Sequence, residues 1–325
     1  MRVVLWTRLV GRKFRERLEA QRGLRLTAPE NFDGLVAAIG GADVLVTDGS
    51  IYDARLAAAL RHDKGSLRLI QLISTGYDGL TRHGVPAGIA VANVGSFYAS
   101  TVAEHAMALL LALLRRLPRS VGAAGDRSAA SGLRSLEDAT VAVIGFGAIG
   151  RAFAERARPF GARIISVVRT DRPEPLADEV VPVSRLHEAL SRADATVLAV
   201  PLTDATLRLI GAAELVACRP GLMLINVARG EVVDTDALTA ALADGRLGGA
   251  GLDVTDPEPL PSDHALRNMP NVLISPHIGG VGRPQAAERI ADLVIDNIRR
   301  VEAGEPPRHA IDASVSSGAV QASYP

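Results

Sequence analysis

The sequence predicts an α/β protein built on two doubly wound parallel sheets, and two observations indicate this class. Short β-branched runs alternate with amphipathic runs rich in Ala, Leu and Arg along the chain. The glycine-rich turn of residues 143–150 joins an apolar run to an Ala-rich helical run at the start of the second of two such series. Strands that are covered on both faces are continuously apolar, as these runs are. At 325 residues, two domains are expected rather than one.

The first series predicts one small doubly wound unit, with helices starting near Arg12, Asn31 and Asp53. Its strands are expected near residues 3–7, 44–47, 69–73 and 90–93. The second series supplies six strands, as two mononucleotide-binding halves require. These are expected near residues 140–144, 164–168, 195–200, 222–226, 249–254 and 272–275.

The segments outside the two series set the expected domain boundaries. Thr101 to Leu117 predicts a helix buried between domains, followed by a loop or arm over residues 118–137. A last helix, residues 284–303, has no further strand of the second series to cover, so we assign it to the first domain. The tail beyond Gly304 is expected to be loosely ordered. The predicted domains are therefore 1–98 with 284–325, and 99–283.

Composition narrows the class of partner to a small molecule. The chain has 36 basic and 36 acidic residues, so nothing favours a nucleic acid or an anionic membrane. The single cysteine, Cys218, excludes an intrachain disulfide and is interpreted as a small buried hydrophobe. The first residues lack a signal-peptide pattern, and the longest apolar run, 106–114, is too short to span a membrane. A cytoplasmic protein is expected.

The glycine-rich turn predicts where a dinucleotide binds. Gly145 would allow a tight turn, Gly147 would let the backbone approach a phosphate, and Gly150 would let helix and strand pack closely. Amide groups at the start of the following helix would then face the pyrophosphate. A strand before the turn and a helix after it make this pattern far more specific than the glycines alone.

The end of the second strand of this series predicts NADP rather than NAD. An acidic residue normally stands there to bind the adenine ribose. In this chain Val168 takes that position and Arg169 follows it, with Thr170 and Arg172 close behind. A guanidinium group suits a 2′-phosphate. Asp171 is the argument for NAD, because a small shift of the strand end would place an acid near the ribose.

Three later strand ends carry an arginine, a carboxylate and an imidazole: Arg229, Glu258 and His277. The segments around them resemble the D-isomer-specific 2-hydroxyacid dehydrogenase family, which includes glyoxylate and hydroxypyruvate reductases. The resemblance covers nearly the whole chain and extends to Ser74–Asp78 and Val102–His105. It implies a Rossmann dinucleotide-binding domain inserted into a flavodoxin-like substrate domain.

The resemblance also assigns residues to substrate and cofactor. The substrate carboxylate would be bound by Thr75, Gly76 and Tyr77. Asn226, Val227, Ala228 and Asp253 would lie on the nicotinamide side. The complete set expected to bind the cofactor is Gly145, Phe146, Gly147, Ala148, Ile149, Gly150, Arg169, Thr170, Arg172, Val200, Pro201, Thr206, Asn226, Val227, Ala228, Asp253 and His277.

The expected chemistry is reduction of a 2-keto acid by hydride. Negative charge develops on the carbonyl oxygen, and a proton must reach it. Arg229 would bind the carboxylate and polarise the carbonyl, and His277 would donate the proton. Glu258 would orient the imidazole and favour its charged form. Non-catalytic explanations remain for two of the three residues: Arg229 could pair with Glu231 or Asp234, and Glu258 could be an exposed loop charge.

Departures from relatives narrow the substrate. The loop around Asp48 lacks the arginines with which phosphoglycerate dehydrogenases hold a phosphate, and Thr75 stands where phosphite dehydrogenases carry a lysine. The family's tryptophan before the dinucleotide strand is also absent, so the resemblance does not identify which side chains form the active-site wall expected near residues 123–131. Glyoxylate, hydroxypyruvate or a modestly larger keto acid would suit the site.

Other readings stay open at this point. The enzyme could be an NAD-dependent D-2-hydroxyacid dehydrogenase, or the chain could be a nucleotide-sensing protein like the C-terminal-binding corepressors that share this fold. No metal is expected, because no cluster has metal-ligand spacing. His105 could be a packing residue or a residue behind the site, and the other histidines apart from His277 are interpreted as structural. A homodimer formed through residues 101–136 is expected from the resemblance.

Overall fold

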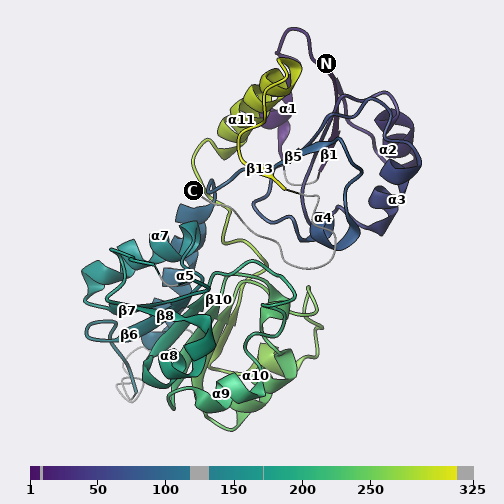
Figure 1. Ribbon diagram of the computed structural model, residues 1–325. Helices are drawn as coiled ribbons and strands as arrows, with labels where there is room; N and C mark the ends of the chain where they lie inside the picture. The colour runs from purple at the N-terminus through teal and green to yellow at the C-terminus, as the bar shows by residue number, and fades with distance from the viewer. Residues whose placement is uncertain (8–9, 118–131, 171, 313–325) are drawn as a thin grey trace. The chain divides into compact units, whose positions relative to one another are not determined.

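The computed structural model describes residues 1–7, 10–117, 132–170 and 172–312. The chain forms two compact units (Figure 1). Unit 1 consists of Met1–Phe97 together with Gly282–Pro325, and unit 2 is the continuous stretch Tyr98–Val281.

Unit 1 contains one six-stranded sheet in the order β13-β5-β4-β3-β1-β2. Strands β1 to β5 are parallel, and β13 joins β5 antiparallel. Their parallel order 2-1-3-4-5 is the flavodoxin-like order. The strands are β1 (Arg2–Trp6), β2 (Arg25–Thr27), β3 (Val44–Thr47), β4 (Leu69–Leu72), β5 (Ala90–Ala92) and β13 (Ala310–Ile311). The helices are α1 (Arg12–Glu19), α2 (Phe32–Ile39), α3 (Ala54–His62), α4 (Asp78–His83) and α11 (Ala286–Glu302).

Unit 2 contains one parallel sheet of seven strands in the order β12-β11-β10-β9-β6-β7-β8. Counted from β6, this is the dinucleotide-binding order 3-2-1-4-5-6 with one further strand. The strands are β6 (Thr140–Ile144), β7 (Arg163–Val168), β8 (Glu179–Pro182), β9 (Ala195–Leu198), β10 (Leu222–Asn226), β11 (Leu247–Leu252) and β12 (Val272–Ile274). The α-helices are α5 (Ala99–Leu114), α7 (Ala148–Ala157), α8 (Leu186–Arg192), α9 (Ala212–Ala217) and α10 (Thr235–Ala243).

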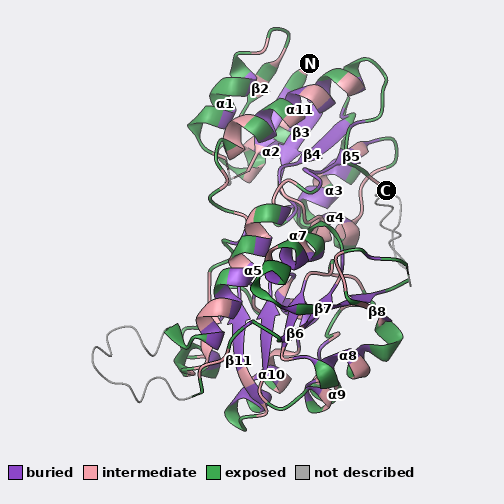
Figure 2. Cartoon of the chain, turned by 90° about the vertical axis from the view of Figure 1, so that its left-hand side faces the viewer, coloured by how far each residue is buried: buried purple, intermediate pink, exposed green. Residues whose placement is uncertain are grey.

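Each face of the unit 2 sheet has its own apolar core. One core joins α5 and α7 to the sheet, and the other joins α8, α9 and α10 to it. Figure 2 shows the labelled strands β6, β7 and β11 as buried, while the helices expose one side. Coverage of both faces explains why these strands are continuously apolar in sequence.

Short polar residues start several of these helices. Asn31 accepts a hydrogen bond from the N–H of Gly34 at 2.8 Å, and Asp53 accepts one from Leu56 at 2.9 Å. Asp234 does the same for Ala237 at 3.0 Å. These side chains satisfy N–H groups that have no partner within the first turn. The predicted starts near Asn31 and Asp53 are thereby explained.

Three strands were not expected from the sequence. They are β2 and β8, which extend the edges of the two sheets, and β13 in the C-terminal segment. The expectation of a loosely ordered tail beyond Gly304 is therefore wrong as far as Asp312; residues 313–325 lie outside the described residues. The helix expected over 101–117 spans Ala99–Leu114 and packs on β10 and β11.

A buried amide pair holds the C-terminal segment on unit 1. Asn297 of α11 donates from Nδ2 to Gln71 Oε1 of β4 at 2.7 Å, and both residues are fully buried. Asn297 also accepts from the N–H of Arg308 at 2.7 Å and donates to its carbonyl at 3.1 Å. These bonds place the chain that leads into β13 against the sheet edge, and the buried amide of Asn297 is fully used.

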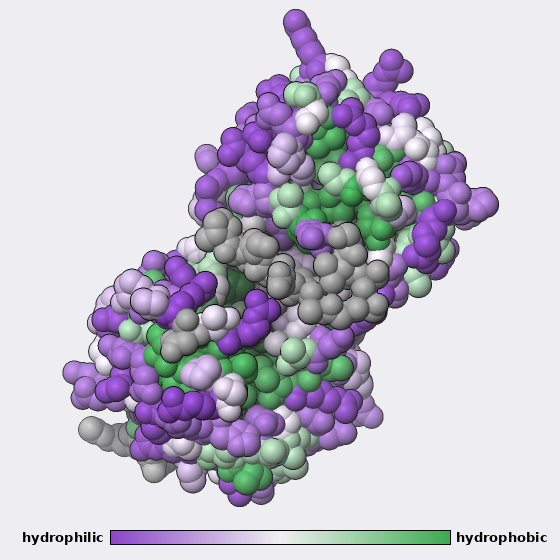
Figure 3. All heavy atoms as spheres, viewed as in Figure 1, coloured by the Kyte–Doolittle hydropathy of each residue, from purple (hydrophilic) through white to green (hydrophobic). Residues whose placement is uncertain are grey.

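The surface carries both hydrophilic and apolar residues. Hydrophilic residues cover most of the face shown in Figure 3, with smaller areas of apolar residues between them. Within the described residues, no helix combines the length and apolar character that crossing a bilayer requires.

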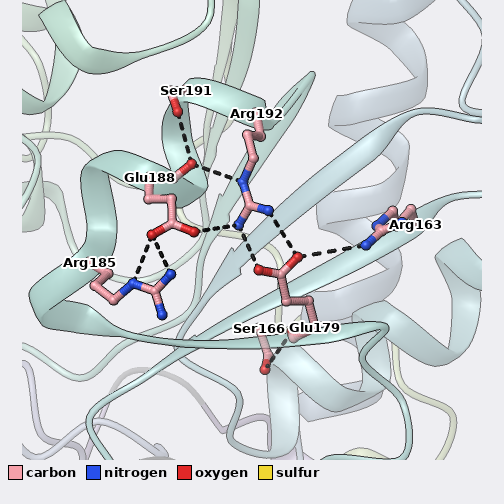
Figure 4. Close-up of polar contacts among 7 residues, drawn as sticks. All are labelled: Arg163, Ser166, Glu179, Arg185, Glu188, Ser191 and Arg192. Atoms are coloured by element: carbon pink, nitrogen blue, oxygen red, sulfur yellow. Dashed lines mark hydrogen bonds and ion pairs between the residues drawn. The ribbon is translucent and has the colours of Figure 1, made fainter.

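A network of charges ties α8 to the edge strand β8 (Figure 4). Arg192 donates to both carboxylate oxygens of Glu179, at 2.7 and 3.1 Å, and Arg163 lies 3.7 Å from the same carboxylate. Glu188 pairs with Arg185 and lies 3.4 Å from Arg192. The hydrogen bond from Arg192 holds the pKa of Glu179 below its ordinary value.

We expect Glu179→Gln to lower the free energy of unfolding at pH 7 by about 1 kcal/mol, because the bidentate charge pair is lost. The native pKa of Glu179 is depressed, so its contribution is present above the ordinary carboxyl pKa and is lost as the pH falls through the native value. Urea unfolding from pH 8 to pH 4 measures this difference, which should shrink only below about pH 5. Glu155→Gln, at an exposed position on α7, is the control and should change stability by less than about 0.5 kcal/mol. A pH-independent difference would contradict the assignment.

Candidate functional site

The turn after β6 has the backbone geometry of a dinucleotide-binding turn. Gly145 has a φ of +92°, and a Cβ built on it would lie 2.6 Å from the carbonyl oxygen of Ala199. A Cβ on Gly150 would lie 2.2 Å from the carbonyl oxygen of Gly145, so only glycine lets α7 approach this closely. A Cβ on Gly147 would meet no heavy atom within 4 Å. The first and third glycines shape the turn, and the second borders open space.

The start of α7 completes this half of the site. The helix begins at Ala148, directly after Gly147, so its first N–H groups face the open side of the turn. Phe146 is buried in the core, and Ile149 is half-buried against it. These residues fit the pyrophosphate of a dinucleotide, because the backbone offers donors where no side chain fills the space.

The next strand, β7, is followed by two exposed polar residues, Arg169 and Thr170. Arg172 is exposed as well, and Asp171 lies outside the described residues. Strand β7 pairs with β6 in parallel, with Val167 opposite Ile144, so these residues follow the strand next to the glycine turn. Nearby, the buried carboxylate of Glu174 accepts a hydrogen bond from Arg151 of α7 at 2.8 Å. This pair joins the segment after β7 to the helix that starts at the glycine turn.

On the other side of the turn, the loop after β9 is shaped by a threonine. Thr206 Oγ1 donates to the carbonyl oxygen of Pro201 at 2.6 Å and accepts from the N–H of Thr203 at 2.8 Å. Val200, half-buried, lies against the turn, with its Cγ1 2.8 Å from a Cβ built on Gly145. Thr206 thus shapes the loop that bears Pro201.

The turn after β10 positions Arg229. Asn226, buried at the strand end, donates from Nδ2 to the carbonyl of Arg229 at 2.8 Å and accepts from the N–H of Ala228 at 3.0 Å. Val227 is buried and donates to the Leu198 carbonyl at 3.3 Å. Both polar ends of the Asn226 amide are therefore used within this turn. The guanidinium of Arg229 donates to the carbonyl of Ala228 at 2.6 Å.

Close backbone contact joins this turn to the one after β11. A Cβ on Gly230 would lie 1.9 Å from the carbonyl oxygen of Thr255, so only glycine fits there. Thr235 Oγ1 donates to the carbonyl of Asp256 at 2.7 Å, and Thr255 Oγ1 donates to that of Pro257 at 2.9 Å. These contacts fix the loop that leads to Glu258.

The turn after β12 brings an imidazole to this carboxylate. His277 Nδ1 donates to Glu258 Oε1 at 2.8 Å, and the two side chains have exposed fractions of 49% and 43%. The carboxylate of Glu258 raises the pKa of His277 above its ordinary value, and burial and the nearby Arg229 oppose this. Adjacent turns of unit 2 therefore carry the three candidates Arg229, Glu258 and His277. The imidazole of His277 is half-exposed, and its protonated form is favoured.

The turn that bears His277 is held by a buried carboxylate, that of Asp253, which the sequence assigned to nicotinamide contact. Asp253, 4% exposed, accepts from the N–H groups of Ile278 and Gly279, at 2.9 and 2.8 Å. It also accepts from Ser275 Oγ at 2.7 Å. His105 of α5 places Nε2 2.8 Å from Ser275 Oγ and 3.3 Å from Asp253 Oδ1.

Sequence reasoning left His105 ambiguous and did not select Ser275. The two residues are 170 positions apart, so no local spacing connects them. The available signal was that each belongs to a segment already singled out, around Val102 and around His277.

In unit 1, the loop after β4 is held by its neighbours at the same sheet edge. Ser74 Oγ accepts from the N–H of Gly49 and donates to the carbonyl of Gly76, both at 2.9 Å. Thr75 Oγ1 donates to the Gly95 carbonyl at 3.1 Å. Within the described part of the chain, the N–H of Gly76 donates no hydrogen bond. Tyr77, half-buried, immediately precedes α4. The loop therefore offers a backbone donor on a fixed scaffold.

Two other chemistries find no support in the described residues. No group of three or more His, Cys, Asp or Glu side chains among them could hold a metal ion. Cys218 is buried, and burial raises the pKa of its thiol to about 11, which makes it a poor nucleophile.

Comparison with known proteins gives consistent matches. Residues 107–279 match the family model described as D-isomer specific 2-hydroxyacid dehydrogenase, NAD binding domain. The chain is 35% identical over 303 residues to a glyoxylate reductase of Thermococcus gammatolerans, with 86% of each chain covered.

Solved structures agree with this match. One is a D-isomer specific 2-hydroxyacid dehydrogenase family protein from Aeromonas salmonicida, at a TM-score of 0.83 and 27% identity, covering 96% of this chain and 99% of that one. Another is a D-isomer specific 2-hydroxyacid dehydrogenase from Xanthobacter autotrophicus in complex with NADPH, at a TM-score of 0.80 and 27% identity, covering 96% and 98%.

The geometry around the imidazole predicts its titration. We expect Glu258→Gln to lower the pKa of His277, because a neutral amide stabilises the imidazolium less than a carboxylate does. NMR of histidine labelled at Cε1, followed from pH 5 to pH 9, measures the shift, with His277→Gln used to assign the signal. Glu231→Gln, two residues beyond Arg229, is the matched control. An unchanged pKa in Glu258→Gln would mean that the 2.8 Å contact does not persist in solution.

Proposed function

Because the chain belongs to the D-isomer specific 2-hydroxyacid dehydrogenase family, and is thus an oxidoreductase acting on CH–OH donors, we propose that it reduces a small 2-keto acid with NADPH. The observation that carries the proposal is the 2.8 Å hydrogen bond between His277 and Glu258, on turns adjacent to that of Arg229. It orients the imidazole, and favours its protonated form, at the sheet edge that also bears the glycine turn.

The residues of unit 2 divide the chemistry among them. A bound nicotinamide nucleotide supplies the hydride. His277 holds the proton on Nε2, since Nδ1 is bound to Glu258, and donates it to the carbonyl oxygen as negative charge develops there. Arg229 stabilises that charge and binds the substrate carboxylate through its planar fork. Glu258 orients the ring and raises the pKa of His277, which favours the protonated imidazole that the reduction needs.

The proposal assigns substrate binding to the loop after β4 as well. The N–H of Gly76 suits a carboxylate oxygen, and the hydroxyl of Thr75 and the ring of Tyr77 border it in sequence. The relative from Thermococcus gammatolerans is a glyoxylate reductase, which supports glyoxylate or hydroxypyruvate as the substrate. A neutral threonine in this loop suits an unphosphorylated keto acid.

The preference for NADPH rests on the residues that follow β7. Arg169, Thr170 and Arg172 would bind the 2′-phosphate, and Val168 leaves no carboxylate at the strand end. The glycine turn from Gly145 to Gly150 would hold the pyrophosphate, with Val200, Pro201 and Thr206 on the adenine side. The structure of the Xanthobacter autotrophicus relative contains NADPH, which supports the same choice.

The direct test is the initial rate of NADPH and NADH oxidation with glyoxylate, hydroxypyruvate, pyruvate and phenylpyruvate. NADPH-dependent turnover of glyoxylate and hydroxypyruvate is expected. Faster NADH-dependent turnover would favour the NAD-dependent dehydrogenase, and nucleotide binding without turnover of any acid would favour a sensing role.

A homodimer is part of the proposal, and light scattering measures the oligomeric state. Much of the arm expected to form its interface, residues 118–131, lies outside the described residues.

We expect His277→Ala to lower kcat about 1,000-fold, because a positioned general acid contributes roughly 100- to 10,000-fold. The dissociation constant for NADPH, measured by nucleotide fluorescence, should stay within about twofold, since the pyrophosphate turn is untouched. His264→Ala, on a loop histidine, is the control and should retain activity. Retention of most activity in His277→Ala would refute the acid–base role.

We expect Arg169→Ala to raise the KM for NADPH about 10- to 100-fold, because a hydrogen bond to a charged phosphate is worth about 1.5 to 3 kcal/mol. The KM for NADH should change little, since NADH lacks the 2′-phosphate. Arg163→Ala, at the opposite end of β7, removes the same charge and is the matched control. Equal loss with both nucleotides would show that Arg169 does not select between them.

A further inference from the structure

The buried carboxylate of Asp253 gathers donors from one short turn. Its Oδ1 accepts from Ser275 Oγ and from the N–H of Ile278, and its Oδ2 accepts from the N–H of Gly279. A Cβ on Gly279 would lie 2.8 Å from that Oδ2, so glycine is needed for this approach. Residues on both sides of His277 are therefore bound to one carboxylate.

The proton positions in this group follow from the contacts. Ser275 has one hydroxyl proton, and it points to the Asp253 carboxylate, which can only accept. Ser275 must then accept from His105, so Nε2 of His105 carries a hydrogen. The same Nε2–H also faces Asp253 Oδ1 at 3.3 Å. A directed chain of hydrogen bonds thus runs from α5 through Ser275 to Asp253.

We propose that His105 is a positioning residue for the reaction: through Ser275 and Asp253 it holds the turn that presents His277. The inference rests on the proposed function for its kinetic part only. His105 belongs to α5, a long helix packed on β10 and β11, so the turn is tied to a rigid element of unit 2.

The turn needs such support because its central residue has an unfavourable backbone. His277 has a φ of +53°, which non-glycine residues rarely adopt, and such conformations persist when their surroundings hold them. The N–H of His277 is bound to the carbonyl of Asp253 at 2.9 Å, so the same residue holds the turn by backbone and side chain. Loss of the bonds from Ser275 and His105 would let the turn relax and move the imidazole.

The charged groups that face His277 determine how such a movement would be seen. Glu258, after β11, raises its pKa most, Asp253 raises it further, and Arg229, after β10, lowers it. Of these, only the contact with Glu258 is a direct hydrogen bond to the ring. Movement of the turn weakens that bond first, so the pKa of His277 would fall.

The test compares His105→Leu, which removes the donor, with His105→Gln, which keeps a side-chain N–H donor. For His105→Leu we expect kcat about tenfold lower, an unchanged Kd for NADPH, and a lower pKa of His277 by NMR and in the pH profile of kcat/KM. His105→Gln should restore most of kcat and most of the pKa of His277. His187→Leu, at an exposed position on α8, is the control and should leave kcat and the pKa of His277 unchanged. A Leu variant with wild-type kcat and an unchanged pKa of His277 would overturn the proposal.

A double-mutant cycle identifies the route. If His105 acts through Ser275, then His105→Leu should have little further effect on the pKa of His277 in a Ser275→Ala background. Additive effects would overturn the relay. The NMR readout needs no substrate, so it remains decisive even if no keto acid is reduced and the proposed function fails. Thermal unfolding of each variant separates loss of position from loss of fold: a pKa shift that appears only where the fold is lost would also refute the role.

Discussion

The parallel pairing of the unit 2 sheet is the constraint on which its chemistry depends. Strands that run the same way end at the same edge, so the residues after β6, β7, β9, β10, β11 and β12 must lie along one line. The strand order reverses between β6 and β9, and the glycine turn follows β6 at that point. Every predicted site residue of unit 2 lies at the end of one of these strands or in the segment that follows it. The sheet brings together side chains that are more than a hundred residues apart.

Along this edge the polar residues fall into two groups. Asn226 and Asp253 are buried, and their side-chain atoms are bound to neighbouring turns. Arg229, Glu258 and His277 are more exposed. A low local dielectric strengthens the buried hydrogen bonds and makes their loss costly. The buried side chains therefore fix the backbone of the turns that carry Arg229, Glu258 and His277. The positions of these three exposed side chains therefore depend on the hydrogen bonds made by the buried ones.

The sequence was informative where structure is decided locally. The glycine turn is an example of such a local feature. The positive φ of Gly145 and the close approach of the backbone at Gly150 both require glycine, so the sequence pattern reveals them. Strands covered on both faces were also recognisable. Strands β2, β8 and β13 were not, since each is a short edge strand whose existence depends on a partner elsewhere in the chain. The link between His105 and Ser275 was equally hidden, because only the packing of α5 on the sheet brings them together.

The division of unit 1 into two segments has a consequence for the order in which the chain folds. Unit 2 is continuous, so all of its strands have been synthesised before α11 is made. Unit 1 must wait, because the Asn297 amide that pairs with Gln71 and the strand β13 that closes the sheet edge come last. During synthesis the edge of β5 is therefore open, and a nascent chain halted before Asn297 would expose it for pairing with another molecule. The described residues from Gly282 to Asp312 thus protect the sheet of the unit whose synthesis begins first and is completed last.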